Sequence, residues 1–177
     1  MEEIIAKYLN YWVDKGLNYL PTEIEKEMLG PSNSSQDDWK MWMPIPSIVT
    51  DSDIYSFEES IGFKYPREYK KFLKFKHFYD LIIGECSFCA HPINSWRKEL
   101  SDFIYNGYPK ECIIEKGKIP FANWSDWGLL CFDTTLVDEN DYPIVLWDHE
   151  YQDEFEFKYS NFETMLFELD KETAKNN

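Results

Sequence analysis

Cys86 and Cys89 have the separation of two zinc ligands or of a dithiol redox pair. The sequence holds three further side chains that a zinc site could use: His77, His91 and Cys112. A zinc knuckle needs a turn between its cysteines, whereas Ser87 and Phe88 include neither the glycine nor the proline that favours one. In an extended strand, residues three apart point to opposite faces. We therefore predict structural thiols, no metal site and no cofactor.

Asp148, His149 and Glu150 combine the side chains used in general acid–base catalysis. On a strand, however, the two carboxylates share one face and the imidazole points to the other, so the three cannot act on one substrate atom. The zinc-protease motif H-E-x-x-H is incomplete because Asp153 stands at its last position. The G-x-S-x-G and G-x-G-x-x-G motifs do not occur. We predict no catalytic residues and a locally hydrogen-bonded His149, and a metal-assisted hydrolase is the least favoured hypothesis.

Two predicted turns are rich in carboxylates, and the first also carries two tryptophans. Six residues make up this pattern, three from each turn: Trp124, Asp126, Trp127, Asp138, Glu139 and Asp141. Carboxylates steer a basic partner, and tryptophans supply the desolvated contacts that carry most binding energy. One interpretation is a partner-binding surface formed by these six residues. A solvated acidic turn beside core tryptophans explains the same residues equally well.

The charge of the chain favours a cationic protein partner. The sequence has 18 basic and 33 acidic residues, for a net charge of −15. Such a surface repels phosphate backbones and anionic lipids, so the charge argues against nucleic-acid and membrane partners. Solubility alone is the simpler explanation of the same charge.

Neither a membrane span nor secretion is predicted. No apolar run approaches the ~18 residues of a membrane helix, and the N-terminus lacks the basic and apolar regions of a signal peptide. Four cysteines are too few for a disulfide scaffold in a chain of 177 residues, and thiols fit a reducing compartment. We expect a cytoplasmic protein, and the sequence leaves its oligomeric state open.

The residues from Ile119 to Asp133 predict a β-hairpin that positions the first of these turns. Two apolar runs, 119–122 and 129–132, flank a polar and aromatic reversal over 123–128 that contains Gly128. The arms are apolar enough to be buried. The tip carries large or charged groups that a turn does not need, so we expect it to be exposed.

Helical spacing and capping signals predict further elements around this hairpin. The predicted helices cover about 1–19, 23–29, 51–61, 66–76, 95–105 and 162–170. The predicted strands cover 39–45, 79–87, 143–148 and 155–159. In the first of these strands, alternation places Trp42 on the face away from the core. Residues 171–177 are expected to form a frayed tail.

Short motifs between residues 51 and 169 follow one another in a familiar order. They are Ile54, Phe57 to Phe63 (FEESIGF), Tyr65 to Leu73 (YPREYKKFL), Ile119 to Ala122, Trp127-Gly128 with Cys131 to Asp133, Val145 to Glu150, and Phe162 to Leu166. This ordered set resembles the SUKH superfamily, the Smi/Knr-type immunity proteins, which also includes fungal cell-wall synthesis regulators. The chain departs from the family pattern at Tyr65, where leucine is usual, and at the hairpin, where only Gly128 remains of a common glycine pair.

The resemblance implies an α+β fold, in which one domain has an antiparallel or mixed β-sheet flanked by helices. Residues 51–170 would form this domain, and residues 1–50 would be an N-terminal helical extension with one possible edge strand. It also implies a non-enzymatic immunity protein that binds and neutralises a cognate toxin, which we expect to be a basic nuclease because an acidic inhibitor can occupy a phosphate-binding site. An intracellular regulatory or scaffold module is the alternative. Replacing Trp124 and Asp126 should then weaken binding and leave thermal stability nearly unchanged.

Overall fold

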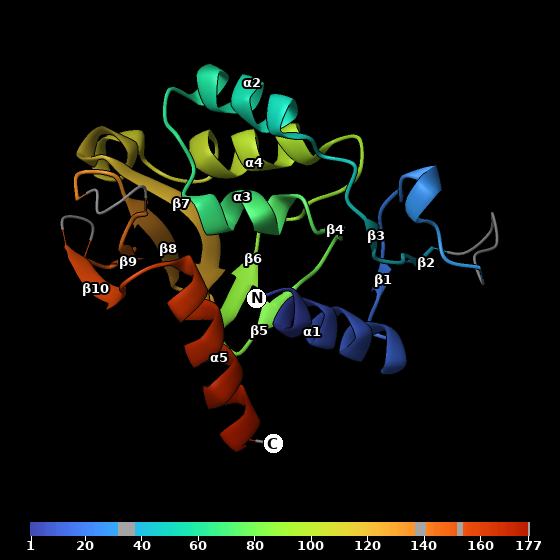
Figure 1. Cartoon of the computed structure of the whole chain (residues 1–177). Coiled ribbons are helices and arrows are strands. Elements are labelled where there is room, and N and C mark those ends of the chain that lie inside the picture. Colours follow the sequence, from blue (N-terminus) through green and yellow to red (C-terminus); the bar gives the residue numbers. More distant parts are fainter. Residues whose placement is uncertain (32–37, 137–140, 152–153, 177) are drawn as a thin grey trace.

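A six-stranded antiparallel sheet is the centre of the molecule (Figure 1), with strands in the order β10-β9-β8-β7-β6-β5. The computed structural model describes residues 1–31, 38–136, 141–151 and 154–176. The strands are β5 (Ile82–Ile83), β6 (Cys86–Phe88), β7 (Lys118–Trp124), β8 (Gly128–Asp133), β9 (Ile144–Asp148) and β10 (Phe155–Tyr159). The helices α1 to α5 surround the sheet, so the predicted α+β fold is confirmed and its sheet is antiparallel.

The predicted hairpin is confirmed as β7 and β8. Trp124 pairs with Gly128 next to the turn, and Lys118 pairs with Asp133 at the far end. Every described residue of β8 is buried, as are most of β7. Alternation along β8 sends Leu130 and Phe132 to the main core.

The main core lies between one face of the sheet and the helices α3 (Arg67–Leu73) and α5 (Phe162–Asn176). Aromatic rings fill it: the Tyr69 ring lies 5.2 Å from those of Phe132 and Phe162, and the Phe121 and Phe132 rings stack at 4.2 Å. Such ring pairs add to the free energy gained by burial. A smaller cluster covers the other face, with these buried members: Ile113, Leu129, Cys131, Val145 and Trp147.

The predicted boundaries of α2 (Asp51–Ile61) are confirmed, and its caps explain them. The Asp53 N–H donates to the Thr50 hydroxyl, and the Asp53 carboxylate accepts from the Thr50 N–H, which completes a capping box. Gly62 ends the helix at φ +79°, a backbone conformation that glycine adopts without strain. The helix α4 (Trp96–Tyr105) was also predicted.

The N-terminal residues share the main core. In α1 (Glu2–Asp14), Ile5 and Leu9 are buried in it, and Lys7 pairs with Asp170 of α5 at 2.7 Å. The helix α5 continues through residues 171–176, which were predicted to belong to a frayed tail, so that prediction is wrong for these residues. The Thr173 hydroxyl supports this last part of the helix by donating to the Leu169 carbonyl oxygen.

Two predictions in the N-terminal part are wrong. The helix predicted over 23–29 is reduced to the 3₁₀ turn η1 (Lys26–Met28). The strand predicted over 39–45 is two short pieces, β2 (Lys40–Met41) and β3 (Ile45–Pro46), which pair with β1 (Tyr19–Leu20) and β4 (Lys76–His77) respectively. Because the strand is broken, its alternation fails and Trp42 is fully buried.

The strand predicted over 79–87 is a hairpin of β5 and β6. Gly84 turns the chain at φ +59°, and Ile83 pairs with Cys86 on either side of the turn. Two 3₁₀ turns, η2 (Lys110–Cys112) and η3 (Ile114–Lys116), precede β7. In the part of the chain that the structure describes, no helix has the length and apolar character needed to cross a membrane.

Candidate functional site

Three turns lie side by side at one end of the sheet. The Ser125 N–H of the β7–β8 turn donates to the Glu85 carbonyl oxygen of the β5–β6 turn at 2.7 Å. On the other side, the His149 N–H of the β9–β10 connection donates to the Trp127 carbonyl oxygen at 3.3 Å. We name this surface the turn edge and define it by residues 84–85, 125–127, 148–151 and 154.

The tip of the β7–β8 hairpin is held tightly. Ser125 adopts φ +50°, which is uncommon for a residue other than glycine. Gly128 closes the turn where a side chain would be crowded, since a Cβ would lie 3.0 Å from the Trp147 carbonyl oxygen. The tip is therefore a fixed platform for the residues between Ser125 and Gly128.

Trp127 separates two depressions on the turn edge. The first has a volume of about 480 Å³. Aromatic rings and carboxylates line it: Trp127, Tyr151, Phe155, Asp148, Glu154 and Glu156. The Trp127 side chain is 36 % exposed, so a partner can still bury much of it.

The second depression has a volume of about 330 Å³, and Tyr108, Trp147 and His149 line it beside Trp127. The Tyr108 hydroxyl donates to the Asn123 side-chain oxygen at 3.0 Å, and the Tyr108 ring lies 5.8 Å from that of Trp147. Burial raises the pKa of Tyr108, so the hydroxyl stays protonated as a donor. This depression offers ring faces and hydrogen-bonding groups.

The ring of His149 is oriented by the hairpin. Its Nδ1 is hydrogen-bonded to the Trp127 carbonyl oxygen, which confirms the predicted local hydrogen bond. A carbonyl oxygen only accepts, so Nδ1 carries the proton and Nε2 is the acceptor of the neutral ring. The strand itself ends at Asp148, whose carboxylate accepts from the Glu150 N–H at 2.8 Å. His149 and Glu150 therefore belong to a turn, where the strand alternation predicted for them does not apply.

The turn edge is strongly acidic. The segments 84–85, 125–127 and 148–151 together with residue 154 contain five carboxylates and neither lysine nor arginine. Carboxylates gathered on one side of a protein of charge −15 create a negative potential that attracts cations and speeds the encounter with a basic partner. The arrangement can bind basic side chains by charge and stack them on aromatic rings.

The structure places Trp124 differently from the prediction. Its side chain is only 7 % exposed and belongs to the main core, and the Lys158 ammonium covers its ring at 4.7 Å. Since Trp124 is the last residue of β7, its side chain points to the core face, whereas Trp127 follows the reversal. The expected exposure of the whole tip is therefore wrong for Trp124 and correct for Asp126 and Trp127.

The two predicted turns lie at opposite ends of β8, so the structure does not bring their residues together. Trp127 precedes β8, and Asp141 follows it and precedes β9. A strand of this length separates them by about 17 Å. The side chain of Asp141 accepts from the Tyr142 N–H, and burial raises the pKa of its carboxyl group. Asp138 and Glu139 lie outside the described residues.

The predicted thiols are buried or partly buried. Cys86 is fully buried in β6, and burial raises its pKa. Burial also raises the pKa of Cys89 to about 12. The protonated forms are poor metal ligands and poor nucleophiles. Among residues 1–31, 38–136, 141–151 and 154–176, no group of three His, Cys, Asp or Glu side chains is arranged to hold a metal ion.

Sequence reasoning missed much of the turn edge. Glu85, Tyr151 and Glu154 belong to the β5–β6 and β9–β10 connections, which are not neighbours of Trp127 in sequence. Gly84 was the available signal, because a glycine inside an apolar run often marks a turn. Had it been used, Glu85 would have been placed at the end of a hairpin.

Comparison with known proteins adds one finding. The sequence model of a family described as SUKH_5, SMI1-KNR4 cell-wall, matches residues 32–168, which is most of the chain. No curated protein matches the sequence.

Proposed function

The chain belongs to the SMI1-KNR4 family of the SUKH group, and from this premise we propose that it is a non-enzymatic immunity protein that binds and neutralises a cognate toxin domain. The proposed partner is cationic, with a basic nuclease as the favoured class. Nucleases bind phosphates and therefore carry basic surfaces that an acidic protein can cover. The proposed place of action is the cytoplasm.

The turn edge is the observation that carries this proposal. It combines carboxylates with a half-exposed tryptophan on a tightly held hairpin. Trp127 would be the desolvated anchor of the interface, and Asp126 beside it would fix the orientation of a basic side chain. Because the platform is already ordered in the isolated chain, little conformational entropy would be lost on binding.

Inhibition would follow from occupation of the toxin's own phosphate-binding surface. Glu85, Asp126 and Glu154 extend the negative charge along the three turns in the way that phosphates extend along a nucleic-acid backbone. Basic residues that a nuclease uses for its substrate would pair with these carboxylates instead. The block would be stoichiometric, since no bond is made or broken.

An intracellular regulatory or scaffold role is a second candidate. The description of the matched family contains the term cell-wall, and the same acidic and aromatic surface would bind a basic cellular protein. The two hypotheses differ in the partner, because only the first requires a toxin whose activity is lost in the complex.

Binding to the toxin encoded beside the gene tests the first hypothesis. We expect an equimolar complex by calorimetry and loss of toxin activity in the same titration. Trp127→Ala should weaken the complex about tenfold or more because it removes the central anchor. Trp39→Ala is the matched control and should leave affinity unchanged, since Trp39 is also exposed but precedes β2, which pairs with β1 outside the six-stranded sheet.

Two results would contradict the proposal. The first is the absence of any complex with the adjacent toxin at low salt, where charge attraction is strongest. The second is a complex that forms without any loss of toxin activity, which would favour the regulatory role.

A further inference from the structure

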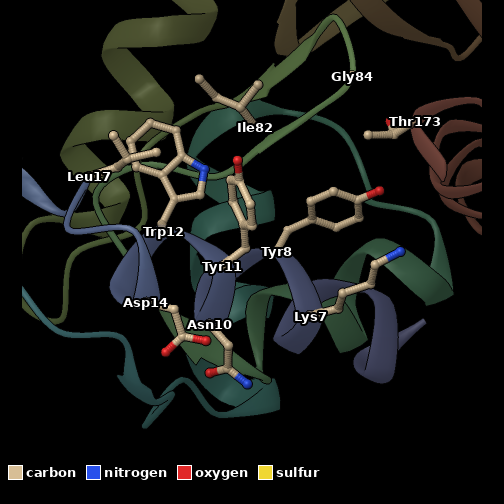
Figure 2. A pocket seen from close by; sticks show the side chains of 10 residues that line it. All are labelled: Lys7, Tyr8, Asn10, Tyr11, Trp12, Asp14, Leu17, Ile82, Gly84 and Thr173. Carbon is tan, nitrogen blue, oxygen red and sulfur yellow. The ribbon is translucent and has the colours of Figure 1, made fainter. Parts of the chain in front are cut away.

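A groove of about 510 Å³ follows α1 at the outer edge of the six-stranded sheet, where β5 is the last strand. Apolar and aromatic side chains form most of its lining: Tyr8, Tyr11, Trp12, Leu17 and Ile82. Figure 2 shows Tyr11 rising from α1 toward Ile82, with Trp12 and Leu17 beside it. Three segments that are distant in sequence, namely α1, β5 and the end of α5, therefore build one concave surface.

Several groove residues remain open to solvent. Tyr11 is 51 % exposed, Leu17 47 % and Ile82 37 %. Single exposed apolar residues are ordinary, but a contiguous group that lines a depression marks a binding surface. The groove differs from the turn edge in being mainly apolar.

The groove continues into the turn edge. Gly84 lines the groove and also forms the β5–β6 turn. The next residue, Glu85, accepts the Ser125 N–H of the hairpin tip through its carbonyl oxygen at 2.7 Å. A partner seated on Asp126 and Trp127 is therefore next to the groove.

The net charge of −15 favours a basic occupant of the groove. Two ammonium groups lie at its border: that of Lys7 is compensated by Asp170 at 2.7 Å, and that of Lys15 lies 5.9 Å from the centre of the Tyr11 ring. Asp14 lies at the end opposite Lys7 (Figure 2), and Glu85 follows the Gly84 wall. A segment with an apolar side chain between basic residues matches both the walls and the rim.

We infer that the groove receives an apolar side chain from a basic segment of the same partner that binds the turn edge. This inference rests on the proposed function and adds a second contact to it. Two contacts on one partner raise affinity, because the second forms at the high effective concentration set by the first. A second copy of this chain fits less well, since both copies carry a charge of −15 and repel each other.

Three synthetic peptides of about 12 residues, the length that two or three helical turns occupy, test the chemistry of the groove. The first has lysines on both sides of a central Leu-Trp-Leu segment. The second replaces that segment by alanines, and the third replaces the lysines by glutamates. We expect the full-length chain to bind the first peptide, with at least about tenfold weaker binding of the other two, as measured by fluorescence anisotropy at low salt.

Matched variants locate the binding. Tyr11→Ala should weaken binding of the first peptide about tenfold, whereas Tyr55→Ala should not, although Tyr55 is also helical and is 59 % exposed. Ile82→Ala should weaken it as well, and Ile48→Ala, at a residue that is 64 % exposed, should not. Circular dichroism and urea midpoints verify that all four variants fold.

Four outcomes would overturn the inference. They are no binding of the first peptide, equal binding of the alanine or glutamate peptide, equal effects of the groove and control variants, and a concentration-dependent dimer that Tyr11→Ala abolishes. The proposed function is judged separately by the toxin complex and Trp127→Ala. A toxin complex that is sensitive to Trp127 but not to Tyr11 and Ile82 would retain the proposed function and reject the groove.

Discussion

Trp124 and Trp127 are three positions apart in one hairpin and have opposite environments. Trp124 ends a strand and lies in the main core, whereas Trp127 lies in the turn and borders two depressions. By residue type alone, the two tryptophans are equally good candidates for contacts with a partner. Their difference comes from strand direction and from Lys158, which covers the ring of Trp124.

Replacing each tryptophan separately tests this difference. Trp124→Ala should lower the free energy of unfolding by about 3–5 kcal/mol because it leaves a cavity in the core. Trp127→Ala should lower it by less than about 1 kcal/mol, since its side chain is half-exposed. Urea unfolding measures both values. Equal losses of stability would show that Trp127 belongs to the core.

His77 and His91 form a buried pair, with their Nδ1 atoms 2.9 Å apart. The Ile48 N–H donates to His77 Nε2 at 3.1 Å, so the proton of the neutral ring is on His77 Nδ1, which donates to His91. His91 stacks on Trp96 with an interplanar angle of 8°. Burial, and then the neighbouring His77, lowers the pKa of His91 to about 3, and burial also lowers that of His77.

This pair predicts that acid destabilises the protein well above the range in which carboxylates titrate. The unfolded chain binds a proton at His91 near pH 6.5 and the folded chain only near pH 3, so stability is complete at neutral pH and falls as the pH drops below 6.5. The loss for His91 alone should reach about 2 kcal/mol at pH 5. Urea midpoints at several pH values measure it.

Two variants separate the buried pair from other titrations. His91→Leu should flatten the pH dependence between pH 7 and pH 5, whatever its effect on total stability. His149→Gln is the matched control, because His149 is exposed, and it should retain the dependence of the original chain. An unchanged slope in His91→Leu would refute the assignment.

At the scale of elements, one side chain joins the N-terminal segment to α4. The Glu25 carboxylate accepts from the Asn94 N–H at 2.7 Å and from the Ser95 N–H at 2.9 Å, just before the first turn of α4. It also accepts from the Ser95 hydroxyl at 2.7 Å. A carboxylate at this position compensates the unpaired N–H groups and the positive end of the helix dipole.

Removing this cap should therefore destabilise α4, although Glu25 is distant from α4 in the sequence. Glu25→Ala should cost about 0.5–2 kcal/mol, because the N–H groups of Asn94 and Ser95 before α4 lose their acceptor. Glu27→Ala, at an exposed position whose contact with the Asn94 side chain is longer at 3.4 Å, should cost less than about 0.5 kcal/mol. Urea unfolding and hydrogen exchange of the first amides of α4 measure the effect. Equal stability of the two variants would show that the cap does not hold the segment.

A second carboxylate joins α2 to α3. Glu58 is buried, and it accepts from the Tyr65 N–H at 2.7 Å and pairs with the Lys70 ammonium at 2.6 Å. Glu58→Ala should cost about 3 kcal/mol because it leaves Lys70 without its partner in a largely buried place. The neighbouring Glu59 is exposed, so Glu59→Ala should change the urea midpoint little. A small effect of Glu58→Ala would contradict this role.

At the scale of the whole molecule, the net charge of −15 predicts how fast a cationic partner associates. Raising the salt concentration from about 0.05 M to about 0.5 M should slow association tenfold or more and change dissociation little, because salt screens long-range attraction. Stopped-flow fluorescence with the cognate toxin measures both rates. An association rate that does not depend on salt would contradict electrostatic steering.

The position of the charge matters as well as its sum. Glu154→Gln and Glu59→Gln change the net charge equally, but only Glu154 lies on the turn edge. We expect Glu154→Gln to slow association more than Glu59→Gln does. Equal effects would show that the net charge alone, without a localised surface, directs the encounter.

The sequence by itself determined features that depend on neighbouring residues: the β7–β8 hairpin, the caps of α2, the net charge and the ordered motifs of the family. It failed where contacts between distant segments decide the outcome. Trp42 is buried because its segment breaks into two short strands. The helix predicted over 23–29 is reduced to a 3₁₀ turn, and Glu25 of this segment caps the distant helix α4 instead.

Only the tertiary structure decided which residues face a partner. Glu85, Ser125, Trp127 and His149 meet because backbone hydrogen bonds join turns from three separate hairpins. The same sheet separates Trp127 from Asp141 by the length of β8. Local patterns specify elements and their buried faces, but strand order places the ends of those elements side by side.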